Sequence, residues 1–295
     1  MSRFLWTQKL DVAPMGTREG VAMSFDSERC RTVLFGGVTL GTGALWKDLN
    51  DTWEWDGSNW TQMADSGPAA RAYSAMAYDA ARKQSVLFSG NLGTVDTWGW
   101  DGRNWTQLAD SGPGASSSSP MVYEAQRRQI LLYNANSGSP ETWGWNGAVW
   151  TQQADTGPSA RVEHAMAYNT QRDRTVLFGG KSVDSGKYFG DTWEWDGATW
   201  TQVSEFGPPP CIGAALAFKG DNVALFGGAS STQDLGATWT WGGKHWTLRQ
   251  DFGPQPRLNH GLVYDTKRET LVLFGGSAQY HAIVFGDTWE HAGIE

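Results

Sequence analysis

Short apolar runs separated by glycine-rich turns recur in a fixed order along the whole chain. One stretch, DTWEWDGATWTQ at 191–202, has close copies that begin at Asp51, Asp96, Glu141 and Ala237. Two other stretches precede each copy, typified by AMAYD at 75–79 and TVLFGG at 175–180. A period of about 45 to 50 residues, made of short apolar runs and turn signals, predicts a repeat protein built from β-strands.

Each repeat holds four apolar runs, so we expect four strands per repeat and six repeats in one domain that spans residues 1–295. Both ends of the chain carry half a copy: LWTQ begins at Leu5, and DTWEHAGIE ends the chain from Asp287. The expected repeats are 10–62, 63–107, 108–152, 153–202, 203–248 and 249–295, and a separate strand is expected at 4–9.

The glycine and tryptophan positions of the repeat resemble the kelch repeat. A double glycine follows an apolar run, as at Gly179-Gly180, and two tryptophans with six residues between them follow it, as at Trp193 and Trp200. The resemblance covers essentially the whole chain and implies a β-propeller of six four-stranded blades. The N-terminal strand then completes the last blade and closes the ring, which leaves no free sheet edge.

Tryptophan is very abundant, and its positions follow the repeat. The chain has 18 tryptophans, and all but Trp46 fall on three repeat positions. We therefore expect most of the indoles to pack between neighbouring blades and to have no part in binding. Trp46 lies off the repeat and is the candidate for a functional role.

Charge and composition exclude several classes of function. The net charge is −8 with no basic cluster, so we expect no binding to nucleic acid. No apolar run is long enough to cross a membrane. The N-terminus lacks a secretory signal, although a removed leader is compatible with the sequence. Two cysteines fit a reducing compartment, so we expect a cytoplasmic monomer.

Propellers carry function in the loops around the central channel, and one class of loop precedes the AMAYD-type run. Aligning the repeats places Arg18, Arg71 and Arg161 at one position, shared with Ser116, Cys211 and Arg257. These arginines either have a structural role or favour anionic ligands at the channel mouth.

The position two residues later does not repeat, and its occupants are Gly20, Tyr73, Ser118, Glu163, Gly213 and Asn259. Variation inside a strict repeat is expected of a specific binding site, because a ligand rarely has six-fold symmetry. Drift without constraint gives the same pattern. We select Ser118 and Asn259 as candidate ligand-binding residues.

A second class of loop follows the double glycine, and three of its members are long and aromatic. Trp46 and Lys47 lie in the first such loop, Tyr188 in the fourth, and Tyr280 and His281 in the sixth. Exposed aromatic side chains beside polar groups are typical of binding surfaces. The alternative is that these loops pack on one another.

Candidate catalytic groups gather at the same expected mouth. Glu163 is the best candidate acid or base, with Glu19 and Tyr73 as further candidates, and each competes with an ordinary surface role. His164 is included beside Glu163, and His260, at the same repeat position, is a candidate ligand contact; a structural role is the alternative for both. No third metal ligand accompanies them, so we expect no metal and no cofactor.

Two classes of function are compatible with these residues. The first is a module that binds a small molecule or peptide at the loop face. The alternative is a cofactor-independent enzyme, such as an isomerase, cyclase or hydrolase, that uses acid–base residues at the mouth. Kelch-type propellers include galactose oxidase, whose copper ligands lie partly outside the propeller, and sialic acid mutarotases. No motif connects this chain to either one.

Overall fold

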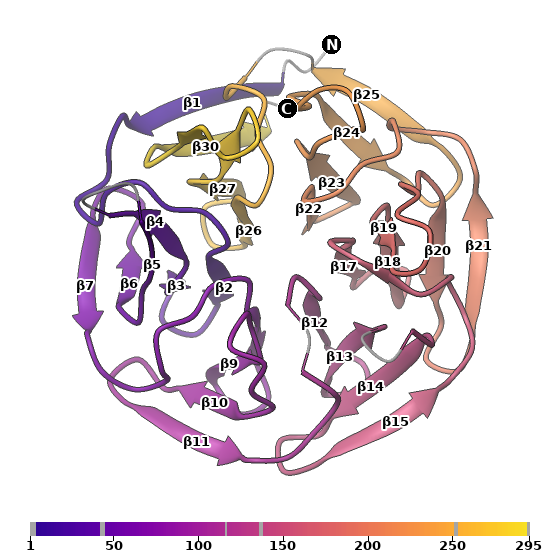
Figure 1. The fold of residues 1–295 in the computed structure, drawn as a ribbon, viewed down its shortest axis with the longest axis horizontal. Coiled ribbons are helices and arrows are strands. Elements are labelled where there is room, and N and C mark those ends of the chain that lie inside the picture. Colours follow the sequence, from indigo (N-terminus) through magenta and orange to yellow (C-terminus); the bar gives the residue numbers. More distant parts are fainter. Residues whose placement is uncertain (1–3, 42–44, 116, 136–137, 251–252, 294–295) are drawn as a thin grey trace.

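Six four-stranded antiparallel sheets form a closed ring in the computed structural model, which describes residues 4–41, 45–115, 117–135, 138–250 and 253–293 (Figure 1). Each sheet is one blade, with one edge strand beside the centre and the other on the circumference. All regular elements of the described residues are strands, and none of these residues forms a helix that could cross a membrane. The predicted all-β, six-bladed propeller is confirmed.

The blades are numbered in chain order, and their strands run from the centre outward. Blade 1 contains β2 (Ala22–Asp26), β3 (Arg31–Phe35), β6 (Thr52–Trp55) and β7 (Trp60–Ala64). Blade 2 contains β8 (Ala75–Asp79), β9 (Gln84–Phe88), β10 (Thr97–Trp100) and β11 (Trp105–Ala109). Blade 3 contains β12 (Met121–Glu124), β13 (Gln129–Asn134), β14 (Glu141–Trp145) and β15 (Trp150–Ala154). Blade 4 contains β17 (Ala165–Asn169), β18 (Arg174–Phe178), β20 (Thr192–Trp195) and β21 (Trp200–Ser204). Blade 5 contains β22 (Ala215–Lys219), β23 (Asn222–Phe226), β24 (Thr238–Trp241) and β25 (Trp246–Gln250). Blade 6 contains β26 (Gly261–Asp265), β27 (Thr270–Phe274), β30 (Thr288–Gly293) and β1 (Phe4–Leu10).

Three short two-stranded sheets involve the loops that follow the double glycine. Two of them are hairpins within such a loop, and they pair β4 (Val38–Leu40) with β5 (Trp46–Asp48) in blade 1 and β28 (Ser277–Ala278) with β29 (Ile283–Val284) in blade 6. In blade 4, β19 (Lys181–Ser182) of this loop pairs with β16 (Arg161–Val162), which precedes the inner strand. Blades 1, 4 and 6 are those where the sequence places its long aromatic loops.

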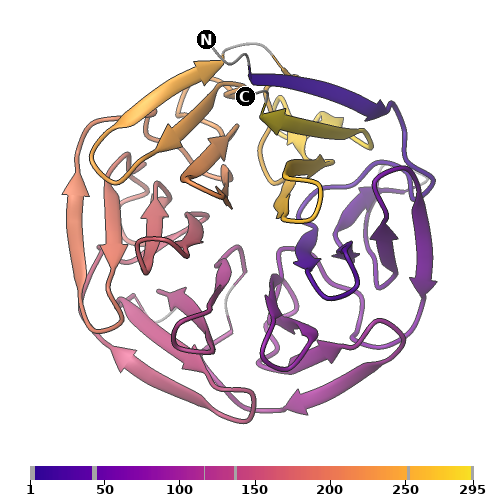
Figure 2. The same cartoon turned by 180° about the vertical axis from the view of Figure 1, so that it is seen from behind.

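Both ends of the chain contribute to blade 6. Strand β1 pairs antiparallel with β30, with Trp6 opposite His291 and Gln8 opposite Trp289. The indigo β1 lies outside the yellow β30 in both views (Figures 1 and 2), and Phe4 pairs with Gly293. The predicted closure of the ring by the N-terminal strand is confirmed.

The outer strands run two residues past the predicted repeat boundaries. Strand β7 ends at Ala64, whereas the first repeat is predicted to end at residue 62. The cause is a β-bulge: Thr52 pairs with Ala64 and Trp53 with Gln62, so Met63 is an extra residue. The same irregularity recurs in blades 2 to 5. A bulge continues the strand while increasing its local twist.

Indole N–H groups connect every blade to the one before it. The first tryptophan of each outer strand donates from Nε1 to a threonine Oγ1 of the preceding blade, at 2.8–2.9 Å. The six pairs are Trp6–Thr238, Trp60–Thr288, Trp105–Thr52, Trp150–Thr97, Trp200–Thr142 and Trp246–Thr192. The predicted interblade packing of the indoles is confirmed.

A second set of indoles is fully buried and distinguishes the blades from one another. Trp100 donates to Glu54 of the preceding blade at 3.0 Å, and equivalent bonds join Trp55 to Glu290 and Trp241 to Glu194. Blades 2 and 3 carry glycine, Gly99 and Gly144, at the position of these glutamates. The Nε1 atoms of the facing tryptophans, Trp145 and Trp195, consequently have no hydrogen-bond partner among the described residues.

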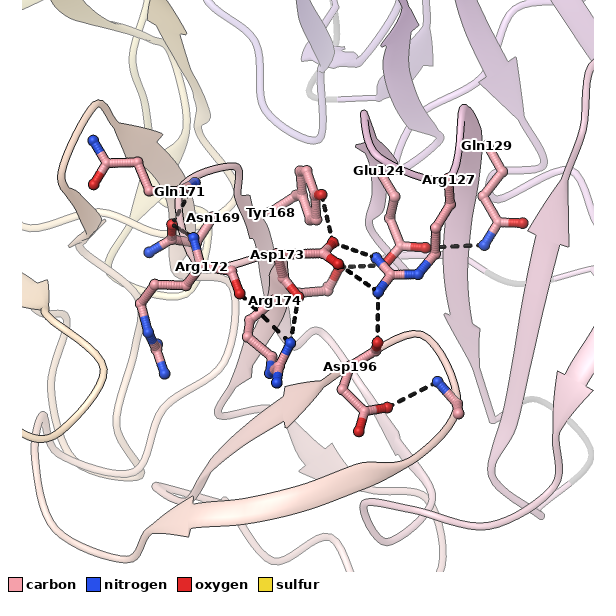
Figure 3. A network of polar contacts seen from close by, with 12 residues as sticks. Glu124, Arg127, Gln129, Tyr168, Asn169, Gln171, Arg172, Asp173, Arg174 and Asp196 are labelled. Carbon is pink, nitrogen blue, oxygen red and sulfur yellow. Dashed lines mark hydrogen bonds and ion pairs between the residues drawn. The ribbon is translucent and has the colours of Figure 1, made fainter.

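The missing glutamate of blade 3 also changes the polar network at the hairpins of the inner strands. In blade 4, Arg172 binds Glu194 of its own blade. In blade 3, where Gly144 offers no carboxylate, Arg127 instead extends to Asp173 of blade 4, at 2.6 and 3.0 Å (Figure 3). These hairpins lie at the opposite ends of the inner strands from the residues considered next.

Candidate functional site

A closed ring of six backbone hydrogen bonds surrounds the mouth of the central channel. One residue of each blade contributes, just before its inner strand, and its N–H donates to the carbonyl of the preceding blade's residue at 2.7–3.1 Å. All six have a left-handed backbone, with φ between 56° and 62°. We call this set the mouth ring: Gly20, Tyr73, Ser118, Glu163, Gly213 and Asn259.

The mouth ring explains why this position does not repeat in sequence. What the blades share is a backbone conformation, which glycine and asparagine adopt most readily and other residues adopt at a cost. The side chain is left free to differ from blade to blade. Tyrosine and glutamate are unfavourable choices for a left-handed residue, so Tyr73 and Glu163 stand out as side chains retained against a backbone preference.

The structure corrects the prediction that the arginines bind ligand at the mouth. Arg18, Arg71 and Arg161 are at most 2% exposed, and each guanidinium forms two hydrogen bonds to one aspartate. Their partners, in order, are Asp51, Asp96 and Asp191. Burial opposes ionisation of these carboxylates, but the arginine hydrogen bonds outweigh it and lower the pKa of all three. These arginines belong to the scaffold.

Two other occupants of the arginine position give no site either. Cys211 is buried, which raises the pKa of its thiol to about 12, so a thiolate nucleophile is excluded. Ser116 lies outside the described residues.

His164 and His260 also lie inside the scaffold. Their rings pack edge-on against Tyr133 and Phe226, with centroids 5.1 and 5.5 Å apart. Burial lowers the pKa of both imidazoles to about 3. No ring nitrogen of either has a hydrogen-bond partner among the described residues. A base of such low pKa is unsuited to proton transfer near neutral pH, so the predicted catalytic role of His164 is not supported. Both histidines line the central channel and neither lines the cavity at the mouth beside Trp46, and the ligand contact of His260 stays a prediction.

Three predicted residues do meet at the mouth, around the buried carboxylate of Glu19. Tyr73 hydrogen-bonds to Glu19, and the amide of Asn259 approaches its Oε2 at 3.4 Å. Two more residues complete the cluster: Ser277, which the sequence did not single out, and His281, which it placed in the long loop of blade 6 without a role. Ser277 donates its hydroxyl to Glu19, and Nδ1 of His281 lies 2.7 and 2.9 Å from the two carboxylate oxygens. Burial, and then the charge of Glu19, raise the pKa of Tyr73.

Glu19, Tyr73 and His281 of this cluster form the floor of a cavity of about 660 Å³, which we call the mouth cavity. Trp46, 47% exposed, also lines it, with its ring edge-on to that of His281 and the two ring centroids 6.2 Å apart. Asp48, on the same strand as Trp46, and Asn91 line it too, and they are joined by hydrogen bonds of 3.0–3.1 Å. The size is within the usual range for small-molecule sites.

Lys47 is exposed between two lining residues of the same strand. Trp46 and Asp48 line the mouth cavity, and successive side chains of a strand point to opposite faces. Lys47 therefore faces away from the cavity, which corrects its predicted role as a ligand contact.

A second cavity, of about 400 Å³, adjoins the first and shares Tyr280 and His281 with it. Tyr188 lines this side cavity, as predicted for the loop of blade 4, together with Ser230 and Thr232 of blade 5. Tyr280 is 90% exposed and stands between the two. The mouth of the ring is thus a divided cleft centred on His281.

Glu163 and Ser118 line the central channel beneath, a cavity of about 190 Å³. The carboxyl of Glu163 has no hydrogen-bond partner among the described residues, and burial raises its pKa, although the charges of Lys181 and His281 oppose this. Within the described ranges, no group of three or more His, Cys, Asp or Glu side chains is arranged to hold a metal ion.

A scan against protein-family models finds no match, and a search of curated proteins finds none either. The fold is similar to 676 chains of known structure, so it is widely shared and does not by itself assign a function. One of them is the structure of YjhT, with a TM-score of 0.72 and 13% sequence identity over 95% of each chain. That similarity supports the propeller fold, and the kelch assignment stays a prediction from the repeat.

Proposed function

We propose that the chain binds a small, polar, uncharged or positively charged molecule in the mouth cavity. The observation that carries this proposal is the cluster at its floor: a buried carboxylate, Glu19, surrounded by hydrogen-bonding groups and open on one side to a cavity with an exposed indole. Buried polar clusters are costly to form unless fully satisfied, so scaffold needs alone do not account for one at a loop face.

The charge around the cavity supports this choice of ligand. Glu19 and Asp48 line it, and the one imidazole among its lining residues, His281, contacts Glu19. The arginines expected to attract anions are neutralised by aspartates inside the scaffold. An anionic ligand would meet two carboxylates without a free cation to offset them, and its binding is disfavoured.

Trp46 gives the site an aromatic wall. An indole face favours apolar faces of polar molecules, such as the C–H face of a ring, and it also attracts cations. Together with hydroxyl and amide groups from Tyr73 and Asn91, which also line the cavity, this set suits a ligand with one apolar face and several hydrogen-bonding groups. The divided cleft offers room for a second moiety on the far side of Tyr280.

The proposal is tested by passing a metabolite extract over immobilised protein and identifying retained compounds by mass spectrometry. Wild type and Phe206→Ala are expected to retain the same compound, because Phe206 is 84% exposed and lines neither the mouth cavity nor the side cavity. Trp46→Ala is expected to lose it and to keep its melting temperature. Retention that is equal in all three proteins would contradict the proposed site.

A further inference from the structure

His281 is held in one orientation by Glu19. A carboxylate can only accept hydrogen bonds, so Nδ1 of His281, 2.7 Å from Oε1, carries the ring proton. Nε2 is then the unprotonated nitrogen, and it has no partner among the described residues. Glu19 is 1% exposed and Ser277 completely buried, so the acidic end of this pair lies beneath and the imidazole faces the cleft.

The backbone that carries His281 is strained. Gln279, Tyr280 and His281 are consecutive residues with φ of 53°, 55° and 68°. Each left-handed residue other than glycine costs roughly 1–2 kcal/mol. Asp234 holds the turn by accepting a hydrogen bond from the N–H of Gln279 at 2.7 Å. Strain of this kind persists where the surroundings impose it, and it is concentrated at functional sites.

Glu163 and His281 line different cavities. Glu163 lines the central channel, whereas His281 lines the mouth cavity and the side cavity. Within the mouth cleft, His281 is therefore the oriented base, and its imidazolium form is the proton donor for the same reaction.

Water has access to His281. The side chain of His281 is 42% exposed, and its neighbours Trp46 and Tyr280 are open to solvent. A site that has to protect a reactive intermediate excludes water, whereas a hydrolase needs it as a reactant. The carboxylates of Glu19 and Asp48 disfavour anionic substrates. These features together fit the hydrolysis of a neutral acyl compound.

We propose that the mouth cleft hydrolyses a small neutral ester, with His281 as general base and then general acid, and Glu19 as the residue that positions His281. This inference rests on the proposed function, because the ester occupies the mouth cavity. Nε2 removes a proton from water while the water oxygen bonds to the acyl carbon. The ester C–O bond then breaks, and the imidazolium gives its proton to the leaving alkoxide. His281 is thereby neutral again, and the net reaction converts one ester and one water into one carboxylic acid and one alcohol.

The first test measures hydrolysis of p-nitrophenyl acetate at about pH 7.5. His281→Gly suits the left-handed backbone, so it removes the imidazole without adding strain. We expect the protein-dependent rate to fall roughly tenfold or more. Imidazole added to the variant is expected to restore the rate beyond the sum of the two separate backgrounds.

His245→Gln is the matched control, because His245 is exposed in a turn of blade 5, away from the lining residues of the cleft. Its rate is expected to stay within about twofold of wild type. The proposal is overturned if His281→Gly keeps the wild-type rate, if both histidine variants fall equally, or if imidazole adds only its background rate.

Two further measurements test the assigned roles. Glu19→Gln is expected to lower kcat and leave KM within about twofold, because Glu19 acts through His281; a change in KM alone contradicts the positioning role. His281→Gly is expected to lower the rate on ethyl acetate more than that on p-nitrophenyl acetate, whose leaving group needs no acid. An equal loss on both esters contradicts the acid role of the imidazolium.

The results also separate this inference from the proposed function. If a compound is retained at Trp46 and His281→Gly hydrolyses the ester as wild type does, binding stands and the hydrolase is wrong. If hydrolysis depends on His281 but Trp46→Ala retains every compound that wild type does, the proposed ligand site is wrong.

Discussion

Replacing Trp6 with alanine tests how much the closing strand contributes to stability. Trp6 is 8% exposed, and the centroid of its ring lies 5.1 Å from the ring centroids of both Phe226 and His291. Its Nε1 donates to Thr238 at 2.9 Å, across the junction between blades 5 and 6. Truncation of a buried aromatic side chain to alanine costs about 3–5 kcal/mol. The free energy of unfolding of a single domain is roughly 5–15 kcal/mol in total, so this loss is a large share of it.

The assay is equilibrium unfolding in urea followed by far-ultraviolet circular dichroism, which avoids the overlapping fluorescence of 18 tryptophans. Trp150→Ala serves as a comparison, because Trp150 has the same contact with the preceding blade but is less buried. Gln8→Ala changes an exposed side chain of the same strand and should cost no more than about 0.5 kcal/mol. We expect Trp6→Ala to lower the free energy of unfolding at least as much as Trp150→Ala does. A decrease of less than about 1 kcal/mol for Trp6→Ala would refute the closing role of β1.

Three further changes test the buried polar groups of the scaffold. Gly99→Glu should raise the melting temperature by about 2 °C, because it offers an acceptor to the unpartnered indole of Trp145 and displaces only the side-chain ends of Gln84 and Leu108; an unchanged or lower value in thermal unfolding contradicts this. Asp191→Ala should cost about 3–5 kcal/mol in urea unfolding, because it leaves Arg161 buried without its counter-ion; a cost below about 1 kcal/mol contradicts the scaffold role. Burial lowers the pKa of His164 from 6.5 to about 3, so the unfolded chain binds the proton first as pH falls, and stability is lost below about pH 6.5. When the pH falls from 7.5 to 5, the free energy of unfolding of His164→Val should therefore decrease by about 2 kcal/mol less than that of wild type. Equal decreases in the two proteins would refute the burial of a neutral His164.

The fold was predictable because its cause is local and repeated. The spacing of Trp193 and Trp200 indicates one hairpin, and the six copies of that hairpin give the number of blades. The truncated copies at both ends indicated how the ring closes. The β-bulge that extends β7 was not predicted, because Met63 differs from its counterparts and the extra residue leaves no mark in the repeat.

The site was predictable only in part, because it breaks the repeat. Trp46 was identified as the one tryptophan off the register, and it does lie at the mouth. The alignment put Arg18 at the right level of the ring but gave no direction for its side chain, which turns inward to Asp51. Glu19 and His281 come from opposite ends of the chain and meet only because blades 1 and 6 are neighbours. No spacing in the sequence relates them.

The central claim, that the mouth cavity holds a ligand against Trp46, is tested most directly by the indole ¹H–¹⁵N NMR signals of the protein. Comparison with Trp46→Phe identifies the signal of Trp46. When a compound retained by the protein is added, the account predicts that this signal shifts in a saturable way while that of the buried Trp195 stays in place. A saturable shift of other indoles with Trp46 unchanged would contradict the account, and would place the ligand away from the mouth.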